Sequence, residues 1–240
     1  MNIAVVMAGG VGSRMGLDIP KQFLTVYDKP IFIYTLEIFQ NNPNIDAIEV
    51  VCIDEWQGIV RSYAKQFKIT KLKWVVAGGN TVSESIRNGI YNLEKECKDD
   101  DIVIIHDSVR PLLKQEVLSN VIAICKEKGN AIASLPCFEH VAITQDNGVS
   151  TTESLPKETC RLILTPQAYK FSLVDNAYHK AFDTDAGIHG SAYTNSMMTD
   201  LGIRLYFAHD SRDNLKLTTF DDISMFKSIL AQHAIEDNEK

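Results

Sequence analysis

Short apolar runs rich in β-branched residues alternate with stretches of helical period through the first 135 residues. The runs that predict buried strands lie at residues 3–7, 48–53, 74–77 and 102–106. The stretches that predict helices lie at 56–67, 83–93 and 117–125, together with one that Pro30 opens. This alternation predicts an α/β fold, with a mainly parallel sheet that helices cover on both faces.

The second half of the chain is less regular. An Asp146-Asn147-Gly148 turn within a polar stretch predicts a protruding β-hairpin arm at about 137–160. The remaining predictions are a loop at 184–193, strands at 203–207 and 215–218, and a Thr219/Asp222 capping box before a final helix. No repeat or linker interrupts the pattern, so we expect a single domain over residues 1–240.

The composition, with 45% hydrophobic and 23% charged residues, is typical of a globular chain rather than a disordered or fibrous one. Asp and Glu number 31 against 24 Lys and Arg, a net charge of −7, so we expect no nucleic-acid partner. No apolar run could cross a bilayer, and no signal peptide is visible, so we expect no membrane partner. The five cysteines are widely spaced and form no C-x-x-C pair, which predicts reduced thiols and a cytoplasmic location.

A glycine-rich turn directly follows the first predicted strand. Its glycines are Gly9, Gly10, Gly12 and Gly16. Glycines at such a place let backbone N–H groups approach a phosphate chain. Their spacing matches neither the dinucleotide-binding G-x-G-x-x-G pattern nor a P-loop, which needs Lys and then Ser or Thr after its last glycine. Two nearby cations, Arg14 and Lys21, indicate phosphate binding; the alternative is a tight turn with two solvated charges.

Asp107 comes directly after a buried strand, at the end where open α/β sheets bind their ligands. A lone carboxylate that faces a triphosphate is most useful as a ligand of Mg²⁺, which neutralises phosphate charge and keeps several waters. The alternative is that Asp107 caps the next turn and forms an ion pair with Arg110. The neighbouring His106 is expected to point into the packed interior.

Three further segments carry polar groups near the ends of predicted elements. Lys216 brings a cation to the end of a predicted strand. Gly78-Gly79-Asn80, with Ser85 at the mouth of the next helix, can present backbone and hydroxyl groups to a base. Thr165 lies in a predicted turn, 164–167, that is expected to lead into a helix. Together with the earlier signals, these segments place three cations, one carboxylate and two glycine turns at the ends of strands in one sheet.

The order of these residues resembles that in the polyol-phosphate cytidylyltransferases, a family that includes the 2-C-methyl-D-erythritol 4-phosphate and ribitol-5-phosphate enzymes. The matching motifs are Gly9-Gly10-x-Gly-x-Arg-Met, Pro20-Lys21-Gln22-Phe23, Gly78-Gly79 with Ser85, His106-Asp107-Ser108-Val109-Arg110-Pro111, Thr165-Pro166-Gln167 and Asp213-Asn214-Leu215-Lys216. The resemblance runs from Ile3 to about Ile229. It implies a Rossmann-like nucleotidyltransferase fold, CTP as substrate, Mg²⁺ as cofactor and a homodimer formed through the arm.

The resemblance also implies roles for individual residues. For the CTP site it indicates Ala8, Gly9, Gly10, Gly79, Asn80, Ser85 and Ser108. For catalysis it indicates Arg14, Lys21 and Lys216, for the metal Asp107, and for the acceptor Arg110, Lys157 and Thr165.

The chain departs from the family pattern mainly on the acceptor side. Lys157 stands where the arm usually carries Arg, which loses bidentate phosphate recognition. The other departures are Val82 for a basic residue, Glu139-His140 for Asp-Thr, and Asn195 in the usual Thr-Asp pair. Gly9-Gly10 and Ser108-Val109 favour the ribitol branch over the methylerythritol branch, so D-ribitol 5-phosphate is the expected acceptor.

The expected reaction transfers a cytidylyl group from CTP to a polyol phosphate and releases pyrophosphate. A phosphate monoester has a second pKa of about 6, so the acceptor needs no general base to become a nucleophile. The alternatives are a 2-C-methyl-D-erythritol 4-phosphate enzyme, a nucleotidyltransferase with another nucleotide or a sugar-phosphate acceptor, and a binding protein that has lost turnover. The glycine spacing disfavours an NAD(P) oxidoreductase.

Overall fold

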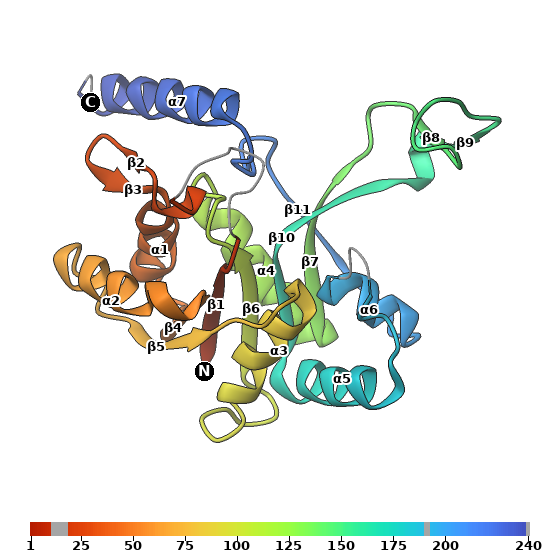
Figure 1. The fold of residues 1–240 in the computed structure, drawn as a ribbon, viewed down its shortest axis with the longest axis horizontal. Helices are drawn as coiled ribbons and strands as arrows, with labels where there is room; N and C mark the ends of the chain where they lie inside the picture. Colours follow the sequence, from red (N-terminus) through yellow and green to blue (C-terminus); the bar gives the residue numbers. More distant parts are fainter. Residues whose placement is uncertain (11–18, 190–192, 239–240) are drawn as a thin grey trace.

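The computed structural model describes residues 1–10, 19–189 and 193–238, which contain a seven-stranded mixed sheet (Figure 1). In spatial order its strands are β11 (Phe207–His209), β7 (Asn130–Pro136), β10 (Arg161–Lys170), β6 (Ile102–Asp107), β1 (Asn2–Ala8), β4 (Ala47–Cys52) and β5 (Leu72–Ala77). The neighbours β6, β1, β4 and β5 are parallel, as are β7 and β11. Only β10 runs antiparallel to its neighbours in this sheet among the described residues. The mainly parallel sheet is therefore confirmed.

Helices cover both faces of the sheet, as the alternating pattern predicts (Figure 1). On one face pack α1 (Ile31–Asn41), α2 (Gln57–Gln66) and α4 (Gln115–Lys128). On the other pack α3 (Val82–Asn92), α5 (Phe171–Thr184) and α6 (Thr194–Asp200). Along β1, Ala4 and Val6 join the first core and Ile3 and Val5 the second, because successive side chains of a strand point to opposite faces.

The C-terminal helix α7 (Phe220–Asn238) packs outside these two layers. Its Phe226 is fully buried and meets the ring of Tyr34 edge-on, with centroids 5.2 Å apart. The capping box is confirmed: the Thr219 N–H donates to the Asp222 carboxylate, and the Asp222 N–H donates to the Thr219 hydroxyl. The remaining short elements are η2 (Lys21–Phe23), β2 (Thr25–Val26), β3 (Lys29–Pro30), η3 (Asp54–Trp56) and η4 (Lys157–Thr159). None of the helices in the described residues combines the length and apolar character needed to span a membrane.

The predicted hairpin is present and projects away from the sheet as an arm (Figure 1). It consists of β8 (Val141–Ile143) and β9 (Glu153–Leu155), which pair antiparallel. The turn requires left-handed backbone at Asn147 and Gly148, whose φ angles are 59° and 90°. The Asp146 carboxylate accepts hydrogen bonds from backbone N–H groups on the far side of this turn. The local sequence thus determines the tip of the arm.

Two strand predictions in the second half are wrong. The segment 203–207 enters the sheet only at Phe207, because its earlier apolar side chains pack against the core beneath α5 and α6 instead. The segment 215–218 is not a strand. Its Leu217 is buried beneath α7, and the Leu217 N–H donates to the carbonyl of Val109.

The prediction of a turn at 164–167 is also wrong, because this segment lies inside β10. The peptide bond between Thr165 and Pro166 is cis, and the pairing of β10 with β7 is interrupted between Ile163 and Gln167. A segment that contains proline between polar residues, as in Thr165-Pro166-Gln167, has little strand signal of its own. Here its long-range pairing with β6 and β7 decides the structure.

A buried acid sits on β4, the strand next to the edge strand β5. Glu49 on β4 is completely shielded from solvent, and its Oε2 accepts a hydrogen bond of 2.6 Å from Asn92. Its Oε1 has no hydrogen-bond partner among the described residues. Burial raises the pKa of Glu49 to about 8, against the smaller opposing effect of Asn92. The native chain therefore keeps this carboxyl protonated at neutral pH.

Replacing Glu49 with Gln should remove a pH dependence of stability. Between about pH 4 and about pH 8 the unfolded chain releases this proton and the native chain retains it, so native stability falls as pH rises. The full slope for one proton is about 1 kcal/mol per pH unit. Urea unfolding of both proteins at several pH values in this interval should show a shallower decline for Glu49→Gln. Parallel declines would contradict the protonated assignment.

Candidate active site

A polar cluster surrounds Asp107, the last residue of β6. The Asp107 Oδ2 lies 3.0 Å from the Arg110 Nε and 3.0 Å from the Lys216 Nζ. The Asp107 Oδ1 accepts a hydrogen bond of 3.1 Å from the Tyr193 hydroxyl. Asp107 and Arg110 are almost fully buried, whereas the Lys216 side chain is 32% exposed. The structure thus brings Lys216 to Asp107 and Arg110, from which the sequence separates it by more than a hundred residues.

The segment that carries Lys216 is fixed by its neighbour Asn214. The side-chain amide of this buried residue donates to the carbonyl of Thr165 at 2.7 Å and to the Asp210 carboxylate at 2.6 Å. The backbone carbonyl of Asn214 accepts a hydrogen bond of 2.8 Å from the Arg110 Nη1. These three bonds tie the segment to β10 and to the turn after β6, which determines where the Lys216 side chain starts.

The cluster forms one wall of a cavity of about 340 Å³. The cavity is lined by Asp107, Arg110, Ile163, Leu164, Thr165, Gln167, Tyr193, Asn195, Ser196 and Lys216. Thr165 accepts a hydrogen bond of 3.2 Å from the backbone N–H of Asp107, and Asn195 accepts one of 3.0 Å from Gln167. Of the residues that the resemblance indicates for the acceptor, Arg110 and Thr165 therefore line one cavity with the metal candidate Asp107.

Two cations contact the Asp107 carboxylate. Burial alone would raise the pKa of Asp107, but the charges of Lys216 and Arg110 outweigh it and lower the pKa to about 2. Burial lowers the pKa of Lys216, but the attraction of Asp107 outweighs it, and the net shift is upward. Of the two cations, Lys216 is the more exposed, so its charge is the one that an anionic ligand in the cavity can reach.

The side chain of His106 is not part of the polar cluster around Asp107. Its ring is fully buried, meets the Phe39 ring edge-on at 5.4 Å, and places Nε2 3.2 Å from the carbonyl of Arg110. Burial lowers the pKa of His106 to about 4. The interpretation of His106 as a packed interior residue is confirmed.

The two glycine turns lie side by side because the register of the parallel strands aligns their carboxyl ends. Ala8 pairs with Cys52, and Cys52 pairs with Ala77, so the chain leaves β1 and β5 at the same edge. Met7 pairs with Asp107, which places the first turn beside the polar cluster around Asp107. A Cβ built on Gly9 would lie 3.8 Å from the Ser85 hydroxyl of the second turn.

Side chains hold each turn in place. The amide of the buried Gln22 donates to the carbonyls of Ala8 and Gly10, at 2.6 and 3.0 Å. In the second turn, the Ser85 hydroxyl accepts a hydrogen bond from the Gly79 N–H at 3.0 Å. The Asn80 N–H donates to Glu84 at 2.7 Å. Only glycine fits at position 79, because a Cβ there would lie 2.4 Å from the Cβ of Glu84.

Ser108, the last residue indicated for the nucleotide, follows Asp107 directly. It is buried, its N–H donates to the Met7 carbonyl at 3.0 Å, and its own carbonyl accepts from the Thr35 hydroxyl at 2.8 Å. Ser108 therefore links the strand end that carries Asp107 to the start of the first glycine turn.

Three indicated cations are not joined to the cluster by the described contacts. Arg14 lies outside the described residues. Lys21 begins η2, directly before the Gln22 that holds the first glycine turn. Lys157 begins η4 on the arm, and no hydrogen bond or ion pair recorded for the described residues links its side chain to Asp107.

Sequence reasoning missed Tyr193, Asn214 and Gln22 as site residues. Asn214 and Gln22 lie within quoted motifs, so their position next to Lys216 and Lys21 was an available signal. Tyr193 precedes the Thr194-Asn195 pair in a segment predicted as a loop, and nothing in the local pattern marks it.

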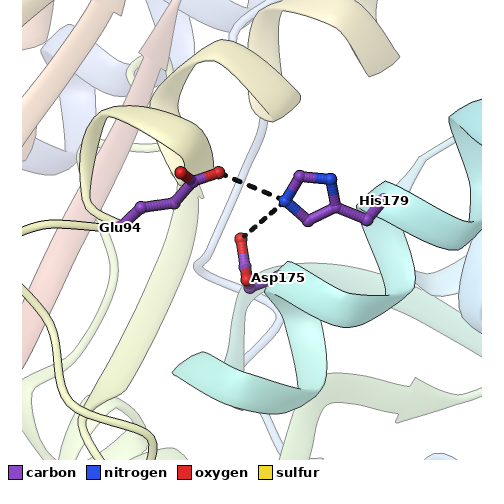
Figure 2. A group of neighbouring side chains, drawn as sticks. All are labelled: Glu94, Asp175 and His179. Atoms are coloured by element: carbon purple, nitrogen blue, oxygen red, sulfur yellow. Dashed lines mark hydrogen bonds and ion pairs between the residues drawn. The ribbon is translucent and has the colours of Figure 1, made fainter.

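A second group of potential metal ligands lies elsewhere, between α3 and α5 (Figure 2). The His179 Nε2 lies 3.2 Å from a Glu94 oxygen and 3.7 Å from the Asp175 Oδ1, and the Tyr91 ring stacks on the imidazole. Glu94 follows the C-terminal end of α3, whereas Ser85 and the glycine turn lie at its N-terminal end. Mg²⁺ prefers oxygen ligands and is usually bound by one or two carboxylates together with substrate phosphates. Asp107 therefore suits this ion better than the group that contains His179.

A family model described as 2-C-methyl-D-erythritol 4-phosphate cytidylyltransferase (IspD) matches residues 2–232. The chain belongs to this family. A ribitol-5-phosphate cytidylyltransferase of Lacticaseibacillus paracasei is 48% identical over 232 residues, which cover 97% of this chain and 99% of that relative. A 2-C-methyl-D-erythritol 4-phosphate cytidylyltransferase of Clostridium novyi is 33% identical, with 95% and 96% covered.

Solved structures of the family share the fold. The 4-diphosphocytidyl-2C-methyl-D-erythritol synthase of Anaerococcus prevotii superposes with a TM-score of 0.80 and 19% identity, covering 96% of each chain. The Rossmann-like nucleotidyltransferase fold expected from the sequence is therefore confirmed, and the chain is a cytidylyltransferase by family.

Removing the Arg110 guanidinium should destabilise the native chain, because it breaks a buried ion pair and a bond to the Asn214 carbonyl. We expect Arg110→Met to lower the free energy of unfolding by about 3 kcal/mol. The matched control is Lys114→Met, which removes an exposed ion pair with Asp213 and should have little effect. Chemical denaturation measures both, and equal losses would contradict a structural role for the buried pair.

Proposed function

We propose that the chain transfers the cytidylyl group of CTP to a polyol phosphate, with D-ribitol 5-phosphate as the preferred acceptor. The observation that carries the proposal is the cavity beside β6, where Arg110 and Lys216 contact the Asp107 carboxylate and the partly exposed Lys216 ammonium can meet a phosphate group. Membership of the family supports CTP as the donor. The 48% identical relative named ribitol-5-phosphate cytidylyltransferase supports the acceptor.

In the proposed reaction, a phosphate oxygen of the acceptor attacks the α-phosphorus of CTP. A new P–O bond forms, the bond from the α-phosphorus to the bridging oxygen breaks, and pyrophosphate leaves. The acceptor phosphate is largely dianionic at neutral pH, so no general base has to remove a proton. Catalysis then consists of holding two anions together and stabilising the charge that develops around phosphorus.

We assign these functions to residues on two sides of the sheet edge. The proposed nucleotide contacts come from Ala8, Gly9, Gly10, Gly79, Asn80, Ser85 and Ser108. Arg14, which lies within the first glycine turn in the sequence, and Lys21, which follows it, would stabilise the triphosphate. Arg110, Thr165 and Lys216 border the cavity and would face the acceptor phosphate and the transferring group.

Asp107 fits the part of a magnesium ligand. Its carboxylate stays ionised and borders the cavity, and Mg²⁺ commonly binds one or two carboxylates together with substrate phosphates. When bound, the ion would neutralise phosphate charge. The Oδ1 oxygen, whose recorded partner is the neutral Tyr193 hydroxyl, is the more accessible ligand atom, because Oδ2 contacts two cations.

We propose that the arm forms a homodimer and brings Lys157 to the acceptor site of the partner subunit. Exposed apolar side chains gather along the arm and the neighbouring sheet edge: Phe138, Ile143, Leu155, Leu162 and Phe207. A protruding hairpin with such side chains is suited to packing against another chain. Lys157 lies on the arm, and no contact recorded for the described residues joins it to the Asp107 cluster, so we assign its role at the acceptor to the site of the partner subunit.

We further propose that the reaction takes place in the cytoplasm and supplies CDP-ribitol for surface polysaccharide synthesis. All five cysteines are free thiols, which is compatible with a reducing compartment. An activated CDP-polyol is a donor for a later transfer reaction, in which CMP would be the leaving group.

The second candidate function is transfer to 2-C-methyl-D-erythritol 4-phosphate, which the name of the family model and the relative from Clostridium novyi favour. The departures from the family pattern concern mainly this choice. Asn195 lines the cavity, Lys157 belongs to the arm, and Glu139-His140 lies at the start of the arm. Val82 is exposed at the start of α3, on the nucleotide side.

A pyrophosphate-release screen tests the proposed function. We expect release with CTP and D-ribitol 5-phosphate, and weaker release with 2-C-methyl-D-erythritol 4-phosphate, glycerol 3-phosphate and the other three nucleotides. The control reactions omit the acceptor or the divalent cation. A preference for 2-C-methyl-D-erythritol 4-phosphate would replace the first candidate by the second, and no release with any polyol phosphate would reject both.

Replacing Lys21 with Ala should lower kcat by about two orders of magnitude, because a cation that stabilises developing phosphate charge is lost. The matched control is Lys126→Ala on the exposed face of α4, which should leave kcat unchanged. Steady-state kinetics with saturating CTP and acceptor measure both variants. A kcat for Lys21→Ala within a few-fold of the parent would rule out its catalytic role.

A further inference from the structure

The hydroxyl of Tyr193 bridges the two charged groups that border the cavity. It accepts a hydrogen bond of 3.1 Å from the Lys216 Nζ and donates one of 3.1 Å to the Asp107 Oδ1. The ring also lies beneath the ammonium, with Nζ 5.4 Å from its centroid. Tyr193 is partly buried. Both its ring and its hydroxyl face the Lys216 ammonium.

The hydrogen-bond donors of Lys216 can be counted. An ammonium has three N–H groups. One points to the Asp107 Oδ2 at 3.0 Å, and a second points to the Tyr193 hydroxyl at 3.1 Å. Because the three bonds are arranged tetrahedrally, fixing two of them also fixes the direction of the third. No partner for this third N–H is recorded among the described residues, and Lys216 borders the cavity with 32% of its side chain exposed.

Arg110 is less accessible than Lys216. Of its five N–H donors, Nε contacts Asp107 at 3.0 Å and one on Nη1 contacts the Asn214 carbonyl at 2.8 Å, and its side chain is only 9% exposed, against 32% for Lys216. Arg110 therefore mainly compensates the buried carboxylate, whereas Lys216 is the more exposed cation at the cavity.

We infer that Tyr193 is a positioning residue that acts through Lys216, directing its third N–H toward a phosphate group in the cavity. The inference rests on the proposed function, to which it adds the residue that orients the charge. A lysine side chain has four rotatable bonds and no preorganised geometry of its own. Without the Tyr193 hydroxyl, Asp107 alone would hold the ammonium, which could then rotate about this single contact.

A double-mutant cycle tests the inference. The variants are Tyr193→Phe, which keeps the ring and removes the hydroxyl, Lys216→Met, and the double variant. Tyr91→Phe is the matched control, because it removes a phenol hydroxyl that contacts His179 between α3 and α5. We expect Tyr193→Phe to lower kcat by about tenfold, the size expected for a lost hydrogen bond to a charged group. The KM for CTP should stay at the parent value, and Tyr91→Phe should leave both kcat and this KM unchanged.

The decisive result is whether the effects of the Tyr193 and Lys216 substitutions on kcat are coupled. If Tyr193 acts only through Lys216, Tyr193→Phe should have no further effect, within about twofold, once Lys216 is Met. Additive losses would overturn the inference, because they would mean that Tyr193 contacts the ligand or supports the fold independently. A kcat for Tyr193→Phe equal to that of the parent would also overturn it.

A binding measurement separates this inference from the proposed function. The same four proteins are titrated with inorganic phosphate, the group common to all polyol phosphates, by calorimetry in the absence of nucleotide. We expect weaker binding in each single variant and no additional loss in the double variant. If no polyol phosphate is turned over but this coupling appears, the proposed function fails and the inference stands. If the parent binds no phosphate, or if the losses add, the inference fails whatever the enzyme turns over.

Discussion

The carboxylate of Asp107 is the interaction on which the rest of the site depends. It is buried at the end of β6 between two cations that come from separate segments, the turn at Arg110 and the segment at Lys216. Two positive groups so close together would repel each other without it, and a buried carboxylate would be unstable without them. The arrangement that keeps the segments together also places the partly exposed Lys216 ammonium at the cavity.

The parallel strands convert local sequence into a shared site. Their register places the ends of β1, β4, β5 and β6 at one edge, so turns that are distant in the sequence become neighbours. The antiparallel β10 then crosses beside β6 and brings Thr165 to the Asp107 backbone. The glycine turns contribute mainly backbone groups, whereas the cavity contributes charged side chains. This division suits a reaction in which one substrate must be recognised by its base and the other by its phosphate.

The sequence was sufficient for the parallel half of the fold and for most of the charged site. Buried parallel strands are continuous apolar runs, and glycines or charges directly after them are visible without a structure. It was insufficient for β10, whose polar sequence with Pro166 becomes a strand only through pairing on both sides. It was also insufficient for Tyr193, because a tyrosine in a loop becomes meaningful only when Lys216 and Asp107 are found against it.

The overall charge of the chain makes the local geometry more important. At a net charge of −7, the molecule as a whole does not attract phosphate compounds over long distances. Salt screens exposed charges over about 8 Å, so the charge of Lys216 at the cavity acts mainly on a ligand that is already in contact. The direction in which the Lys216 ammonium points therefore matters as well as its charge, and the Tyr193 hydroxyl, which contacts both this ammonium and the Asp107 carboxylate, limits that direction.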